Sequence, residues 1–218
     1  RDYASMFQEA AAGQAGRAGV FAALLARAGM EGPHLPFEGK AGWCDHVAGR
    51  RFTLPAMGGK GAPFKILDTI IKTRTGEVHT IPPVLAAEKI APLKNPKDVK
   101  EVTVEVYKKA MDNVGSGEQH WNPTSHEDAA DSVAYLIAAT LMDGTVNPQS
   151  FDEAHLWNPA LRALLPKIKV IENEKFTTAY ERMPQEYRAR VTLVTGSGER
   201  LTGESGGGDQ DDLAGPKS

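Results

Sequence analysis

The chain has 218 residues, of which 24% are charged and 41% hydrophobic, so it can bury one large core or two smaller ones. A formal net charge of −3, with Lys and Arg scattered along the sequence, argues against the basic surfaces that bind nucleic acid or anionic membranes. The single cysteine, Cys44, excludes an internal disulfide, and the sequence carries no secretory or lipidation signal, so we expect a cytoplasmic protein.

The first part of the chain predicts a helix followed by a long connection. From residue 2 to 27, apolar and small residues recur near helical spacing, and Gly29 follows as a stop signal. From residue 30 to 63, glycine and proline recur every few residues, which indicates a connection with one short helix at 41–47. Because the chain begins within a helical pattern and ends in GGGDQDDLAGPKS, we expect it to be part of a longer protein.

The next segment mixes strand and helix patterns. Residues 64–74 carry several β-branched side chains and predict a strand, and residues 99–107 alternate valine with polar residues, as a half-buried strand does. Between them, Thr80 precedes an apolar helix whose first turn holds Pro82 and Pro83, where a missing N–H costs little.

Residues 120–144 predict one long helix at the centre of the fold. Ser125 is a suitable N-cap, with an acidic residue three positions later, and glycine ends the segment. Nearly every residue of 133–142 is apolar, so the helix needs packing partners on most of its sides. The side chains that we expect in the core are Tyr135, Ile137 and Leu141.

The last part of the chain predicts short helices at 151–157 and 159–165 and a strand at 168–171. A hairpin formed by 188–195 and 200–204 around a GSG turn follows. Strands separated by helices and followed by a hairpin predict an α+β fold, in which helices and sheet form two layers.

Several short patterns resemble catalytic or metal-binding motifs, but their spacing or neighbouring residues do not fit those motifs. GESGG at 203–207 fits the pattern of a nucleophile elbow, but an elbow leads into a helix and GDQDD follows here. The six histidines show no H-x-x-x-H spacing, so we predict no metal site. The acidic residues within 209–212 lack the spacing of a calcium loop.

His79 lies where the predicted strand that carries Lys72 and Arg74 gives way to the predicted helix. Its ring would lie beside free backbone N–H groups and two cations, an arrangement that suits a small carboxylate ligand. The positive end of a helix also lowers the pKa of an imidazole, which would leave the ring neutral and able to accept a proton near pH 7. The alternative is an ordinary surface histidine in a turn.

Five phrases of the sequence, in order, resemble the MmgE/PrpD (2-methylcitrate dehydratase) family. They are GRAGVFAALLARAGMEGP, PFEGKAGW, GGKGAPFKILDTIIK, HWNPTSHEDAADSVAYLIAATLMDG and FDEAHLWNPALRALLPKIKV, and the resemblance runs over essentially the whole chain. It implies that residues 1–58 are the end of the central segment of an all-helical domain plus a linker. Residues 59–205 would form an α/β sandwich lid domain, and 206–218 a linker that returns to missing C-terminal helices.

The resemblance implies a lyase that uses neither a metal nor an organic cofactor. Such an enzyme dehydrates or decarboxylates a small di- or tricarboxylate, such as 2-methylcitrate or cis-aconitate, as in propionate metabolism, by removing a proton next to a carboxylate. The ligand would lie between the lid and a helical half that is missing from this chain, so the chain alone would be inactive. A homodimer built through the helical domain is also implied. An epimerase or isomerase of the same family is one alternative.

The family's lid phrase, with a lysine and the pattern P-x-E-x-H, falls on Lys72 and His79, with Glu77 between them. The resemblance therefore implies that Lys72 and His79 are catalytic and that Lys72 and Glu77 bind the substrate. Arg74, the second cation beside His79, joins the expected substrate-binding residues. So does Arg17, which falls in a family phrase of the N-A-A-R type, here QAGR.

The sequence departs from the family's pattern at three places, one of which is the absence near Gln8 of the lysine that often precedes the N-A-A-R phrase. Thr75 and Gly76 stand where Pro-Ala is usual, and DAADSVAY at 128–135 lacks a His and a Pro of the family's phrase. These departures motivate a second alternative, a non-catalytic member that binds carboxylates.

Overall fold

The computed structural model describes residues 6–54, 61, 63–64, 66, 69–207 and 213. The chain divides into two compact units, one formed by Ser5–Thr69 and the other mainly by Ile70–Ser218.

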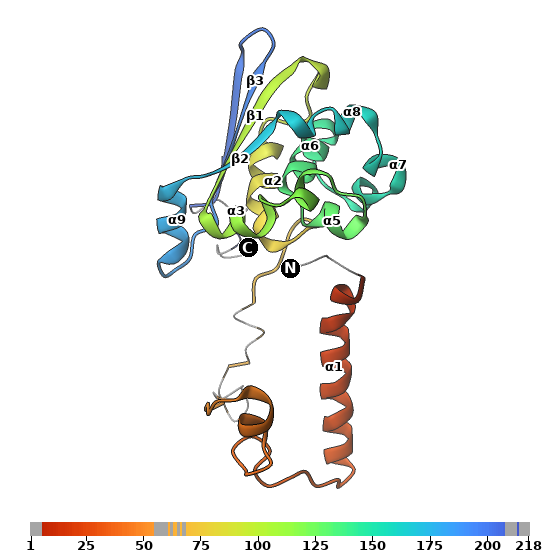
Figure 1. Ribbon diagram of the computed structural model, residues 1–218, viewed down its shortest axis with the longest axis vertical. Helices are drawn as coiled ribbons and strands as arrows, with labels where there is room; N and C mark the ends of the chain where they lie inside the picture. Colours follow the sequence, from red (N-terminus) through yellow and green to blue (C-terminus); the bar gives the residue numbers. More distant parts are fainter. Residues whose placement is uncertain are drawn as a thin grey trace. The chain divides into compact units, whose positions relative to one another are not determined.

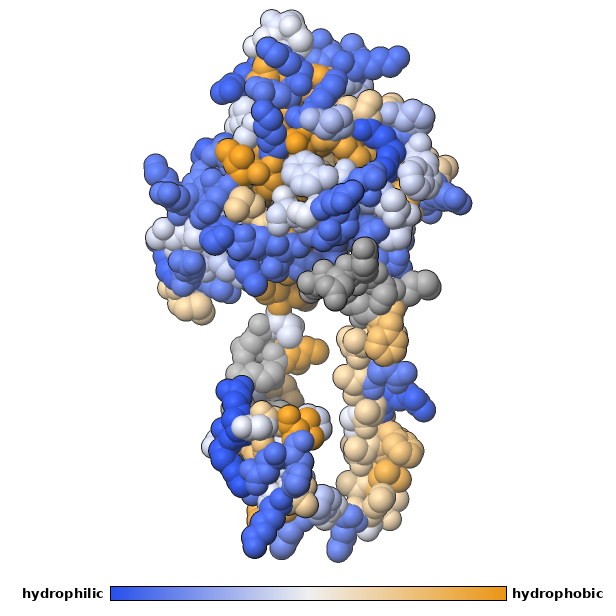
Figure 2. All heavy atoms as spheres, viewed as in Figure 1, coloured by the Kyte–Doolittle hydropathy of each residue, from blue (hydrophilic) through white to orange (hydrophobic). Residues whose placement is uncertain are grey.

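The first unit contains α1 (Met6–Arg27), the helix expected at the start of the chain (Figure 1). The chain leaves this helix through Gly29, whose φ of +93° is a conformation that glycine adopts more readily than other residues. Apolar side chains of α1 such as Val20 and Phe21 are exposed, and Figure 2 shows apolar residues along its visible face. The short helix expected at 41–47 is a π-helical turn, Cys44–Ala48.

The second unit is built on a four-stranded sheet in the order β2-β1-β3-β4 (Figure 1). Its strands are β1 (Val99–Val106), β2 (Ile168–Glu172), β3 (Ala189–Thr195) and β4 (Arg200–Ser205). β2 runs parallel to β1, whereas β3 is antiparallel to both β1 and β4. Two predicted strands and the predicted hairpin are thereby confirmed.

One face of the sheet carries alternate apolar side chains, and two helices cover that face. Val102, Val104 and Val106 of β1 are fully buried, as the alternation of the sequence predicts. α2 (Ile81–Glu88) packs on β3 and β4 and also against α6 (Val133–Asp143), which reaches β2. The α+β class expected from the sequence is confirmed.

Shorter helices surround this core. They are α3 (Lys108–Val114), α4 (Glu118–Trp121), α5 (His126–Ala130), α7 (Glu153–Leu156), α8 (Pro159–Arg162) and α9 (Glu174–Glu181). Single 3₁₀ turns lie at Val78–Thr80, Pro96–Asp98, Pro148–Phe151 and Leu165–Lys167.

The prediction of one helix over 120–144 is wrong, because the segment forms three helices: the end of α4, then α5 and α6. Pro123 follows α4, and proline cannot donate an N–H to a continuing helix. Ser125 and Ser132 then cap α5 and α6 by accepting from the N–H groups of Asp128 and Tyr135. The expectation about the core is confirmed, since Tyr135, Ile137 and Leu141 are fully buried.

The prediction of a strand over 64–74 is also wrong for the residues of that range that the structure describes. Ile66 and Ile71 are exposed, so their β-branched side chains do not pack on the sheet. Strand propensity favours an extended chain, but a strand forms only where a neighbouring strand pairs with it.

Gly203 of β4 allows the helix layer to approach the sheet closely. A Cβ at this position would lie 2.0 Å from the carbonyl oxygen of Ala86 on α2. Ser205, two residues further on, donates its hydroxyl to the carbonyl oxygen of Pro82 at 2.6 Å. The serine of the GESGG phrase therefore holds α2 on the sheet, and it lies within a strand rather than at an elbow.

We expect Gly203→Ala to lower the free energy of unfolding by on the order of 3 kcal/mol, because the added methyl group must push α2 and β4 apart. Urea denaturation followed by circular dichroism measures the change. Thr202→Ala is the matched control, since Thr202 is exposed on the same strand. Equal stabilities of the two variants would contradict the close approach.

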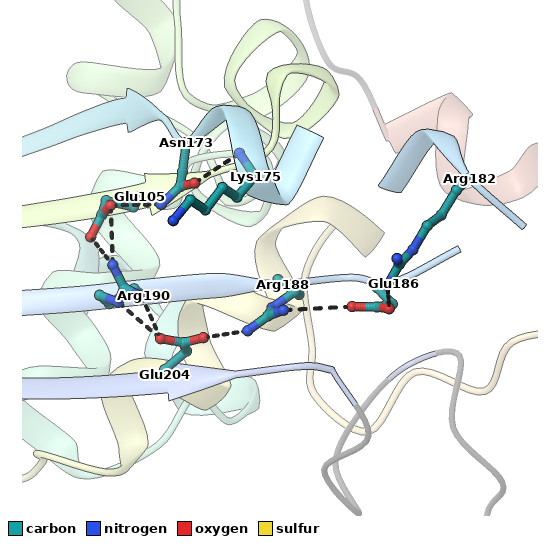
Figure 3. A network of polar contacts seen from close by, with 8 residues as sticks. All are labelled: Glu105, Asn173, Lys175, Arg182, Glu186, Arg188, Arg190 and Glu204. Carbon is teal, nitrogen blue, oxygen red and sulfur yellow. Dashed lines mark hydrogen bonds and ion pairs between the residues drawn. The ribbon is translucent and has the colours of Figure 1, made fainter. Parts of the chain in front are cut away.

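The other face of the sheet carries a network of ion pairs (Figure 3). Nη1 of Arg190 lies 3.2 Å from Oε2 of Glu105 on β1, and Nη2 lies 2.8 Å from Oε2 of Glu204 on β4. Glu204 also accepts a hydrogen bond from Arg188 at 2.7 Å. Burial alone would raise the pKa of the Glu204 carboxyl, but hydrogen bonds from Arg188 and Arg190 and their charges lower it overall.

A carboxyl with a lowered pKa in the folded state stabilises the fold above its unfolded pKa, about 4.3, and loses this contribution as the pH falls through its folded value. Glu204→Gln should therefore lower the free energy of unfolding at pH ~7, by at most about 1 kcal/mol because the pair is partly exposed, and by less at pH ~3. Urea denaturation at both pH values tests this. The control is Glu199→Gln in the adjoining turn, and a Glu204→Gln effect that is the same at both pH values would contradict the prediction.

Candidate functional site

The candidate site is built on the turn that precedes α2 in the second unit. Gly76 has a φ of +135°, and a Cβ there would lie 2.6 Å from Oγ1 of Thr80 and 3.2 Å from Cδ1 of Leu136. The N–H of Glu77 donates to the carbonyl oxygen of Ala130, the last residue of α5, at 3.0 Å. The turn is therefore packed against α5 and α6.

His79 is buried within this turn, with 6% of its surface exposed. Its Nδ1 lies 2.6 Å from the hydroxyl oxygen of Tyr107, which directly follows β1. Tyr180 of α9 stacks on Tyr107, with ring centroids 4.3 Å apart, and presents its ring edge-on to His79. Tyr187 meets both tyrosine rings edge-on. A cluster of aromatic rings, here called the tyrosine cluster (Tyr107, Tyr180 and Tyr187), thus surrounds part of the imidazole.

Within the tyrosine cluster, the surroundings of the Tyr107 hydroxyl raise its pKa. Burial raises the pKa of Tyr107 far above its usual range, and the neighbouring Tyr180, Tyr187 and Glu77 raise it further. The phenol of Tyr107 therefore keeps its proton at physiological pH. It is a neutral partner for His79, unlike the carboxylate that orients histidine in many enzymes.

Of the cations expected at the site, Lys72 lies at the turn and Arg74 is engaged elsewhere. Nζ of Lys72 donates to the carbonyl oxygen of Gly76 at 2.7 Å. Arg74 makes two parallel hydrogen bonds to Glu88 on α2, at 2.6 and 2.8 Å. A guanidinium that already binds a carboxylate in this way has less capacity for a substrate carboxylate.

The backbone N–H groups at the start of α2 already have partners, although the sequence led us to expect free ones. The N–H of His79 donates to Oε2 of Glu77 at 2.6 Å, and that of Thr80 donates to the Glu77 carbonyl oxygen at 2.9 Å. The N–H of Ile81 donates to Val78, and Pro82 and Pro83 have none. An anion at this turn would therefore be held by side chains.

The expected site residues thus fall into three groups. Lys72, Glu77 and His79 lie together on one turn, Arg74 lies near it but pairs with Glu88, and Arg17 lies on α1 in the first unit. Tyr107 is the residue that sequence reasoning missed. It was assigned only as the end of a predicted strand, and nothing in the local pattern indicates that a residue 28 positions away contacts His79.

Among the residues that the structure describes, no group of three or more His, Cys, Asp or Glu side chains is arranged to hold a metal ion. Within the same ranges, no helix combines the length and the apolar character needed to cross a membrane.

Comparison with known families agrees with this architecture. Residues 1–54 match the MmgE/PrpD N-terminal domain, and residues 76–205 match the MmgE/PrpD C-terminal domain. The second match alone covers more than half of the chain, so the chain belongs to the MmgE/PrpD family, and the resemblance seen in the sequence is confirmed. No curated protein matches the sequence.

We expect Gly76→Ala to lower the free energy of unfolding by about 1–3 kcal/mol, because the methyl group meets Thr80 and Leu136 in a backbone conformation that strains alanine. Gly198→Ala is the matched control. Gly198 also has a positive φ, +87°, but a Cβ there meets nothing within 4 Å. Urea denaturation of both variants isolates the crowding, and an equal loss of stability would show that only the backbone conformation matters.

Proposed function

We propose that this chain contributes the lid of a cofactor-independent lyase, a dehydratase or decarboxylase, that acts on a small di- or tricarboxylate such as 2-methylcitrate or cis-aconitate. The observation that carries the proposal is the buried imidazole of His79, which lies on the same turn as Lys72 and Glu77. Its Nδ1 is hydrogen-bonded to the hydroxyl of Tyr107. Membership of the MmgE/PrpD family supports it.

The chemistry follows from the charge that forms during the reaction. When a proton leaves the carbon next to a carboxylate, negative charge moves onto the carboxylate oxygens, and donors placed there in advance stabilise the transition state. The ammonium of Lys72 has three N–H groups, so it can bind a carboxylate while one N–H continues to donate to the Gly76 carbonyl oxygen. His79 and Lys72 would together bind the substrate carboxylate and assist proton transfer.

The remaining assignments complete the proposal. Residues 59–205 form the lid and residues 1–58 belong to the helical domain, whereas the linker expected over 206–218 lies almost entirely outside the residues that the structure describes. We propose Arg17 of α1, and Arg74 and Glu77 of the second unit, as further substrate-binding residues. The intact protein is a cytoplasmic homodimer, and the helical domain provides the other acid-base groups.

Two alternatives are tested by the same assay. An epimerase or isomerase would change the stereochemistry of a carboxylate without releasing water or carbon dioxide. A non-catalytic member would bind carboxylates without turnover, which the pairing of Arg74 with Glu88 and the Thr75-Gly76 departure favour. Incubation of the intact protein with a panel of di- and tricarboxylates, product analysis by NMR, and calorimetric binding of the same compounds distinguish the three.

We expect His79→Ala to lower the turnover of the intact protein by about a hundredfold or more, as the loss of a group that takes part in proton transfer does. Steady-state kinetics on the best substrate of the panel measures the effect. His34→Ala is the control, because His34 is exposed in the first unit. Turnover of His79→Ala within a few-fold of the unchanged protein would remove His79 from the mechanism.

A further inference from the structure

The hydrogen bond between Tyr107 and His79 has a direction that burial decides. Among the residues that the structure describes, Nδ1 of His79 is the one hydrogen-bond partner of the Tyr107 hydroxyl, and Tyr107 is fully buried. A phenol carries a single proton, and a buried donor that points at no acceptor is costly. The proton of Tyr107 must therefore point at Nδ1.

This direction determines which nitrogen of His79 carries a proton. A nitrogen that accepts a hydrogen bond is unprotonated, so a neutral imidazole whose Nδ1 accepts from Tyr107 has its own hydrogen on Nε2. We propose that Tyr107 is a positioning residue that holds His79 in the neutral Nε2–H tautomer, so that the ring acts as a hydrogen-bond donor toward a substrate carboxylate. The catalytic part of this inference rests on the proposed function, whereas the tautomer does not.

The surroundings of Tyr107 keep the arrangement in place. Tyr180 lies nearly parallel to Tyr107, with an interplanar angle of 9°, and Tyr187 packs at 87° to it, so the phenol ring is restrained on two sides. Because burial raises the pKa of the Tyr107 hydroxyl, the phenol does not become an anion that would accept a proton from Nδ1.

The Nε2–H tautomer gives His79 a different role from the proton acceptor that the sequence suggested. A neutral ring with hydrogen on Nε2 cannot accept a proton at that atom, so it would not be the base that removes the substrate proton. It would instead donate a hydrogen bond to the carboxylate as negative charge builds up there, and a neutral imidazole is known to serve as such an electrophile. The base would then be another group of the intact protein.

The tautomer can be read directly by NMR on the chain labelled with ¹⁵N-histidine. In the unchanged chain at neutral pH, we expect the signals of His79 to show a protonated Nε2 and an unprotonated Nδ1. In Tyr107→Phe, which lacks the donor, we expect the two tautomers to mix. Tyr180→Phe is the matched control, because it removes a neighbouring hydroxyl and keeps the ring stack, and it should leave the signals unchanged. His79→Gln assigns them.

The kinetic test separates this inference from the proposed function. We expect Tyr107→Phe to lower the turnover of the intact protein roughly tenfold, the upper range for one lost hydrogen bond. Loss of activity in His79→Ala, with normal turnover and an unchanged tautomer in Tyr107→Phe, would overturn the role of Tyr107 and leave the proposed function standing. Full activity in His79→Ala would remove His79 from the mechanism, and with it the catalytic part of this inference, but it would leave the tautomer assignment standing.

A protonated Nδ1 in the unchanged chain would overturn the tautomer assignment by itself. This measurement needs no variant, so it decides the question even if Tyr107→Phe does not fold.

Discussion

Nine consecutive residues of α6, from Val133 to Leu141, are buried, and the second unit is arranged so that they stay out of water. Burial of apolar surface is worth roughly 25 cal/mol per Å², so a helix that is apolar on all sides stabilises whatever packs around it. The same burial obliges each polar group inside to find a partner. The hydroxyl of Thr140 donates to the Leu136 carbonyl oxygen at 2.7 Å, and that of Tyr135 to the Ser150 carbonyl oxygen at 2.6 Å.

The candidate site is subject to the same constraint. Its turn packs against α5 and α6 through Glu77 and Gly76, so the helices that form the core also hold the imidazole of His79 in place. A buried imidazole must hydrogen-bond, and one partner of His79 is a phenol whose own proton has one described acceptor. The direction of one hydrogen bond, and with it the role that we propose for the histidine, follows from the burial of the phenol.

Sequence patterns predicted those elements whose signal is local. The alternating valines of β1 and the GSG turn of the hairpin are signals that lie within a few neighbouring residues, and both elements form where the sequence predicted them. The prediction of one long helix over 120–144 was wrong because Ser132 caps a new helix inside an otherwise continuous apolar pattern. The prediction of a strand over 64–74 was wrong because strand propensity does not depend on whether a neighbouring strand is available for pairing.

By itself, the sequence determined the α+β class, the apolar character of α6 and the family, and it placed His79 just before the helix that begins at Ile81, because composition, periodicity and phrases are properties of neighbouring residues. Only the tertiary structure decided that Arg74 pairs with Glu88 and that Tyr107 meets His79. Those contacts join residues 14 and 28 positions apart, and the packing of β1, α2 and α9 around the turn brings them together. No local pattern encodes such a meeting, because it depends on where the whole core places each element.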